Sequence, residues 1–144
     1  MNQSRTSDYA ALVLRATLGT MFLAHGLLKV VVFTLPGTMS FFAAVGFPGW
    51  LAYPVTVAEI TGGALLILGI QTRAVSIALL PVLLGAVAVH IGNGWVFSNP
   101  NGGWEYPAFL TAATVTQAML GDGALAVRFG LQRAHLADAK TAAA

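Results

Sequence analysis

An apolar run of about 20 residues, from Trp50 to Ile70, constrains this chain more than any other feature. A helix of that length is about 30 Å long, which matches the hydrocarbon core of a bilayer. Glu59 lies near the middle of the run. An acidic or basic side chain there costs roughly 2.5 to 3.5 kcal/mol on insertion scales unless it is paired or protonated. The run therefore predicts a transmembrane helix whose polar side chain is turned toward other helices.

The helical face that carries Glu59 is lined by small and apolar residues. Helical spacing places on this face Ala52, Val55, Thr56, Gly62, Gly63 and Leu66. Small side chains on a membrane helix allow a neighbouring helix to approach closely. We therefore expect the other spans to pack against this face and to form the walls around the acid.

Composition extends this interpretation to the whole chain. Hydrophobic residues make up 57% of the 144 residues and charged residues only 8%, whereas a soluble domain has about 25% charged residues. We predict an all-α integral membrane four-helix bundle that forms a single transmembrane domain over residues 1–144. The predicted spans are about 10–32, 50–70, 74–91 and 105–127, and residues 128–144 form a tail. The net charge of +2 is too small to indicate nucleic-acid binding, and the chain has no cysteine for thiol chemistry.

The connection between the first two predicted spans, Phe33–Gly49, contains helix breakers at Pro36-Gly37 and Pro48-Gly49. Between them, residues Thr38 to Val45 have room for two turns of helix, about 12 Å, which is too short to cross a membrane. The segment is rich in aromatic residues, namely Phe41, Phe42 and Phe47. We expect a short interfacial or re-entrant helix here.

Basic residues are distributed unevenly between the two sides of the predicted bundle. Four spans place both termini on one side, and that side receives Arg5, Arg15, Arg73, Arg128, Arg133 and Lys140. The two opposite loops contain no Lys or Arg. Because positively charged loops stay in the cytoplasm, we predict a multi-pass protein with both termini cytoplasmic.

The intramembrane charges are predicted to form two layers. Arg15 and Asp122 both lie about 9 Å from the midpoints of their spans toward the cytoplasm, so we expect a structural ion pair between them. The outer layer holds the candidate ligand-binding residues His25, Lys29, Glu59, His90 and Glu105.

Each outer-layer residue also has a structural interpretation. Lys29 can extend its ammonium group to the nearby interface, and Glu59 can pair with Lys29 or accept hydrogen bonds from His25 and Thr56. His90 can be a hydrogen-bonded interface residue, and Glu105 can favour a helix N-terminus. Two histidines and two carboxylates could in principle hold a metal, but their spacing matches no metal motif, so we predict none.

The order and spacing of several short motifs resemble those of the DoxX family. These motifs are Arg15, His25-Gly26 with Lys29, Gly46-Phe47-Pro48, Glu59 with Gly62-Gly63, Leu68 to Arg73, and Gly102 to Tyr106. The resemblance implies a four-helix protein of the bacterial or archaeal cell membrane. Its namesakes are linked to quinone-dependent oxidoreductases, including subunits of thiosulfate:quinone oxidoreductase.

Two function classes remain. The first is an accessory subunit of a membrane redox system that binds a quinone-like or other lipophilic molecule in its outer half, with Lys29 and His25 as donors and Glu59 setting their protonation. The cavity that holds this molecule would be bounded by the segment that contains Phe41 and Phe42. The chain has no haem-ligand pattern, dinucleotide fingerprint or thiol, so we expect no intrinsic cofactor, and electrons would come from a redox-protein partner. Membrane lipids are expected partners, and a homo-oligomer is left open. The second class is a non-catalytic scaffold or small-solute carrier.

Overall fold

The computed structural model describes residues 3–127, and all regular structure in that range is helical. The predicted tail at 128–144 lies outside the described residues. The elements are α1 (Gln3–Val31), α2 (Leu35–Ala44), the 3-10 turn η1 (Gly49–Leu51), α3 (Ala52–Leu68), α4 (Thr72–His90), the 3-10 turn η2 (Ile91–Asn93) and α5 (Glu105–Leu120). This arrangement confirms the predicted all-α membrane bundle.

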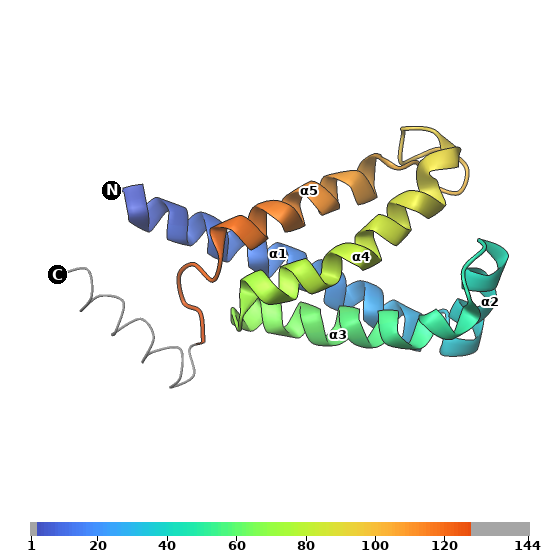
Figure 1. The fold of residues 1–144 in the computed structure, drawn as a ribbon, viewed down its shortest axis with the longest axis horizontal. Coiled ribbons are helices and arrows are strands. Elements are labelled where there is room, and N and C mark those ends of the chain that lie inside the picture. The colour runs from blue at the N-terminus through green and yellow to red at the C-terminus, as the bar shows by residue number, and fades with distance from the viewer. Residues whose placement is uncertain (1–2, 128–144) are drawn as a thin grey trace.

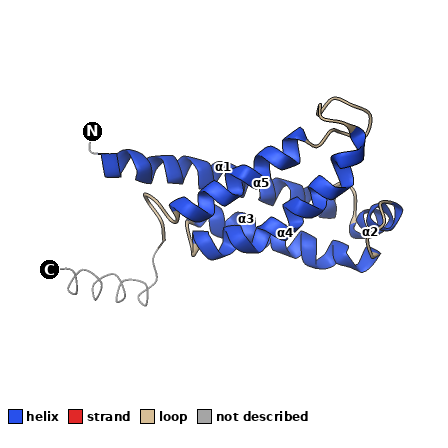
Figure 2. Ribbon diagram, turned by 45° about the horizontal axis from the view of Figure 1, so that its top comes forward, coloured by secondary structure: helices blue, strands red, loops and turns tan. Residues whose placement is uncertain are grey.

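The helices pack as two pairs. Helix α1 packs mainly against α3, and α4 packs mainly against α5. Figure 1 shows the start of α1, the α3–α4 turn and the end of α5 at one end of the molecule. Helix α2 and the loop after η2 lie at the opposite end. Figure 2 shows α2 turned across that end of the bundle rather than running along it.

Among residues 3–127, three segments are long and apolar enough to cross a membrane, namely Ser4–Val31, Gly49–Leu68 and Thr72–Asn93. Helix α5 has 16 residues and is therefore about 24 Å long, which is shorter than the hydrocarbon core. The predicted fourth span continued to residue 127, but the helix ends at Leu120. Gly121 follows with a φ of 82°, and the Gln117 side-chain amide donates to the Gly121 carbonyl at 2.8 Å. This positive φ, which glycine adopts without steric cost, stops the helix.

Helix α1 begins at Gln3, seven residues before the predicted start of the first span near residue 10. The polar segment that precedes the apolar run contains neither Gly nor Pro. Nothing in it therefore interrupts a helix that the apolar run already supports. The extra turns lie at the end of the molecule that holds the α3–α4 turn (Figure 1).

Glycines bring α1 and α3 into backbone contact. A Cβ atom added at Gly63 would lie 2.6 Å from the Leu23 nitrogen and 2.7 Å from the Gly19 carbonyl oxygen. A Cβ added at Gly19 would meet the Gly63 oxygen at 2.7 Å. Both distances are too short for real atoms, so only glycine permits this packing. The close approach confirms that the small-residue face of α3 turns toward a neighbouring helix.

The short helix between the first two long helices is confirmed, and it starts three residues earlier than predicted. Thr34 precedes α2, and its side-chain oxygen accepts a hydrogen bond from the Gly37 nitrogen at 3.3 Å. Pro36 lies in the first turn, where the absence of its N–H costs no hydrogen bond. Ten residues make α2 about 15 Å long, so it does not cross the membrane.

Candidate functional site

Lys29 and Glu59 form an ion pair between α1 and α3. The Lys29 Nζ lies 2.6 Å from the Glu59 Oε2, and the two side chains are 17% and 7% exposed. Gly26 makes room for this contact, because a Cβ atom there would lie 3.1 Å from the Glu59 Cβ and 2.6 Å from the Ile60 Cγ1. The sequence offered this pair as one of two interpretations of Glu59, and the structure contains it. The pair compensates two charges that would be costly alone in the bundle.

Helix α2 is fastened beside this ion pair. The buried Thr38 hydroxyl lies 2.9 Å from the Thr34 carbonyl and 3.4 Å from the Lys29 carbonyl, so it links α2 to the last turn of α1. On the same helix, the rings of Phe41 and Phe42 lie 6.3 Å apart in an edge-to-face arrangement. Phe41 and Phe42 were predicted to bound the site, and their helix is therefore hydrogen-bonded through Thr38 to the backbone of Lys29.

His25 lies at the edge of this site rather than inside it. Its side chain is exposed, which differs from the predicted inward orientation, but it is close enough to Glu59 to interact with it electrostatically. The ring Nδ1 lies 2.8 Å from the Met21 carbonyl. A carbonyl can only accept, so Nδ1 carries the proton and Nε2 of the neutral ring is an acceptor. His25 can therefore donate to a ligand only when the imidazole is protonated.

Thr56 adds a polar group that the sequence analysis considered only as a partner of Glu59. It lies one turn before Glu59 on α3 and is 3% exposed. Its hydroxyl has no hydrogen-bond partner among the described residues. Threonines elsewhere in the chain, such as Thr61, donate to the carbonyl four residues earlier. The Thr56 hydroxyl is thus a buried group with unused hydrogen-bonding capacity beside the ion pair.

The other two predicted ligand-binding residues flank the loop between α4 and α5, with His90 at the end of α4 and Glu105 at the start of α5. His90 is hydrogen-bonded through Nδ1 to the Ala86 carbonyl at 2.8 Å. The Glu105 Oε1 accepts a hydrogen bond from the Phe97 nitrogen at 2.7 Å. Within residues 3–127 no three His, Cys, Asp or Glu side chains lie close enough together to hold a metal ion. The residues of the predicted outer layer therefore lie at two separate places. Lys29 and Glu59 form one, with His25 at its edge, and His90 and Glu105 belong to the other.

At the end of the bundle opposite to the Lys29–Glu59 pair, Arg15 links α1 to α3 and to the segment after α5. Its guanidinium donates to the carbonyls of Leu66 and Ile67 at 3.0 and 2.5 Å, and to the Ala124 carbonyl at 2.9 Å. Asp122 interacts electrostatically with Arg15, and its Oδ1 also accepts from the Thr72 nitrogen at 3.0 Å. Asp122 lies after α5 rather than within a span. The ion pair between Arg15 and Asp122 remains a prediction. Each residue also caps a helix, since Arg15 binds carbonyls at the end of α3 and Asp122 binds a backbone nitrogen at the start of α4.

The α4–α5 contact contains a polar seam that the sequence analysis missed. Its residues are fully buried, namely Thr72, Ser76, Thr114 and Gln117. Within the described part of the chain, the three hydroxyls and the Gln117 side-chain oxygen have no hydrogen-bond partner. The sequence contained a signal for this seam. Thr72 and Ser76 are four residues apart on α4, and Thr114 and Gln117 are three apart on α5, so each pair shares one helical face.

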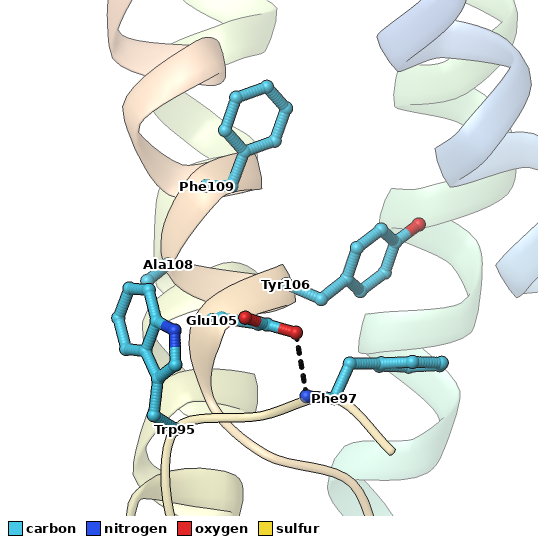
Figure 3. A pocket seen from close by; sticks show the side chains of 6 residues that line it. All are labelled: Trp95, Phe97, Glu105, Tyr106, Ala108 and Phe109. Carbon is cyan, nitrogen blue, oxygen red and sulfur yellow. Dashed lines mark hydrogen bonds between the residues drawn. The ribbon is translucent and has the colours of Figure 1, made fainter.

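An open groove lies beside the first turn of α5 and the loop that precedes it (Figure 3). Its volume is about 670 Å³, and it is lined by Trp95, Phe97, Glu105, Tyr106, Ala108 and Phe109. The rings of Trp95 and Trp104 meet edge-to-face with centroids 4.4 Å apart. Neither Lys29 nor Glu59 lines this groove. The sequence did not predict this groove, because the groove depends on how the loop folds back onto α5.

The fold and the buried ion pair define a small all-helical integral membrane protein. Residues 10–91, more than half of the chain, match the DoxX family, and the chain belongs to that family. The curated relatives include "Putative oxidoreductase CatD" of Bacillus subtilis (strain 168), which is 33% identical over 84 residues. The alignment covers 58% of this chain and 61% of the relative, so the chain spans about three fifths of the relative's length. No solved structure matches this chain.

Proposed function

We propose that the protein is an accessory subunit of a membrane redox system and holds a quinone-like apolar molecule beside Lys29 and Glu59. The observation that carries this proposal is the unpartnered Thr56 hydroxyl, which is buried one turn from the ion pair. Buried polar groups are nearly always hydrogen-bonded, so a hydroxyl left without a partner here favours a bound molecule with an acceptor oxygen. Membership of the DoxX family and the oxidoreductase name of the relative support the redox assignment.

The residues around Thr56 suit the carbonyl groups of a quinone. The Lys29 ammonium group has three N–H donors, and Glu59 uses one of them. The other two can donate to a carbonyl oxygen and stabilise the charge that develops there on reduction. Reduction to the quinol consumes two electrons and two protons. The redox-protein partner supplies the electrons, and protonated His25 and Lys29 supply the protons.

The proposed setting is a bacterial or archaeal cell membrane with both termini in the cytoplasm. The arrangement in Figure 1 supports this orientation, because the start of α1 and the α3–α4 turn lie at the end opposite to α2. The start of α1 contains Arg5, the first turn of α4 contains Arg73, and Arg15 donates to carbonyls in the last turn of α3. The loops at the α2 end contain no Lys or Arg. In this orientation the Lys29–Glu59 pair occupies the outer half of the bundle.

A scaffold without redox activity is the second candidate function. The short Lys29–Glu59 distance and the low exposure of both side chains favour it, since a closed pair also locks α1 onto α3. Under this alternative the buried polar groups specify packing and bind no ligand.

Mass spectrometry of lipophilic molecules that leave with the purified protein separates the two functions. We expect the parent to retain a quinone-like molecule, and we expect Thr56→Val and Lys29→Met to lose it. Thr61→Val is the matched control, because it removes an exposed hydroxyl from the same helix that already donates to the Val57 carbonyl. A parent protein that retains no such molecule, or a Thr56→Val variant that retains as much as Thr61→Val, would support the scaffold instead.

A further inference from the structure

The groove beside α5 combines aromatic walls with one carboxylate. Figure 3 shows Glu105 between Trp95 on one side and Phe97 with Tyr106 on the other. The Phe97 and Tyr106 ring centroids lie 5.7 Å apart. These rings are not packed away as core residues, because Trp95 is 54% exposed and Phe97 is 61% exposed. The groove therefore presents π-faces and a negative charge to its surroundings.

Glu105 has no cationic partner among residues 3–127. Its Oε1 accepts from the Phe97 nitrogen, and its other carboxylate oxygen makes no hydrogen bond within the described range. The sequence from 74 to 127 contains no Lys or Arg, so the loop and α5 supply no such partner. Arg73, in the first turn of α4, lies beside Gly121 at the other end of α5, and His90 is hydrogen-bonded to the Ala86 carbonyl. By contrast, the carboxylate of Glu59 is paired. Within the described residues, the carboxylate of Glu105 therefore forms no ion pair and is open to an external cation.

A belt of interface aromatics alone does not require this arrangement. Trp and Tyr are common at membrane interfaces whether or not an acid lies among them. Here the acid sits between the rings, and its hydrogen bond to the Phe97 backbone holds one ring beside the carboxylate. Aromatic faces attract organic cations within about 6 Å of the ring centroid, most strongly when water is excluded. A carboxylate adds a direct charge contact to that attraction.

We infer that the groove lined by Trp95, Phe97, Glu105 and Tyr106 binds an alkylammonium group that is attached to an apolar chain. The ammonium group would lie between the rings against the free oxygen of Glu105. The chain would follow the apolar surface of Ala108 and Phe109 along α5. The headgroup of an amine-bearing phospholipid and a free lipophilic amine share this chemistry. This inference does not rest on the proposed redox function, because the two sites share no residue.

Fluorescence titration with hexyltrimethylammonium tests the inference directly. A Trp50→Phe background leaves only Trp95 and Trp104 as tryptophan reporters; Trp95 lines the groove, and Trp104 packs against Trp95. In a nonionic detergent we expect a saturable change with hexyltrimethylammonium and none with hexanol at the same concentration. Glu105→Gln keeps an oxygen that can accept from the Phe97 nitrogen but removes the charge, and it should weaken binding about fivefold or more. Asp8→Asn is the matched control for charge, because it removes an exposed acid at the other end of the molecule.

The source of the ammonium group is distinguished in nanodiscs. Weaker binding of the probe in phosphatidylethanolamine discs than in phosphatidylglycerol discs indicates that a lipid headgroup fills the groove, whereas equal binding indicates a free amine. If Glu105→Gln does not fold, Phe97→Leu tests the same contact at a 61% exposed position and should also weaken binding. Equal responses to hexyltrimethylammonium and hexanol, or unchanged affinity in both variants, would overturn the inference.

Discussion

Replacing Lys29 and replacing Glu59 should lower the free energy of unfolding by unequal amounts, although both changes break the same ion pair. In Lys29→Met the Glu59 carboxylate remains 7% exposed in the middle of a membrane helix, so it must take up a proton or stay charged in hydrocarbon. Insertion scales give roughly 2.5 to 3.5 kcal/mol for a charged side chain at that depth. In Glu59→Gln the Lys29 ammonium lies within three residues of the end of α1 and can reach the interface, and Gln still offers an acceptor. We expect a loss of about 3 kcal/mol for Lys29→Met and about 1 kcal/mol for Glu59→Gln.

The double variant measures how strongly the two groups are coupled. It contains no buried charge at this site, so its free energy of unfolding should exceed that of Lys29→Met alone by about 2 kcal/mol. Equilibrium unfolding by SDS in mixed micelles, followed by tryptophan fluorescence, gives the four free energies of the cycle. Equal costs for the two single variants, or a double variant whose loss is the sum of both, would refute the asymmetry and the coupling.

The other predictions concern packing, capping and orientation. Gly63→Ala should destabilise the protein by about 2 kcal/mol, because its new Cβ meets α1 backbone, whereas Gly85→Ala, with nothing within 4 Å, should be neutral or slightly stabilising in the same unfolding assay. Asp122→Asn should lower the free energy of unfolding, and adding Arg15→Gln should recover part of that loss; a double variant as unstable as the sum would remove the predicted pairing. A cysteine at position 99 in place of Asn99 should react with an impermeant thiol reagent in intact cells. Labelling only after lysis would show that this loop is cytoplasmic and that the predicted orientation is wrong.

The sequence was sufficient to predict the all-α membrane bundle, and it offered the Lys29–Glu59 pair as one of two structural interpretations of Glu59. The high cost of an unpaired charge near the middle of a span favoured a partner or a proton for Glu59, and Lys29 was the Lys or Arg that the sequence placed in the outer half. His25 was predicted to donate to a molecule bound inside the bundle, but it lies at the exposed edge of α1. Spacing along one helix identifies a face, and it does not show how far a neighbouring helix covers the margin of that face.

The features that the sequence did not predict depend on single backbone conformations or on distant contacts. Residues 121–127 are mostly small and apolar, so their composition resembles that of a helix, but Gly121 and Gly123 adopt positive φ angles and end α5 early. The groove at Glu105 forms because the loop returns to α5 through the hydrogen bond to Phe97. Such a contact depends on loop conformation, which a hydrophobic pattern does not specify.

Photo-crosslinking with an azido-quinone in native membranes tests the central proposal most directly. After illumination, proteolysis and mass spectrometry would map the labelled residues. The account predicts that label is concentrated on the peptides around Lys29 and Thr56, that excess unlabelled quinone competes for this labelling, and that Thr56→Val reduces it while Thr61→Val does not. Labelling that is absent, that unlabelled quinone does not reduce, or that is confined to the groove at Trp95 and Glu105 would contradict a quinone site beside the ion pair.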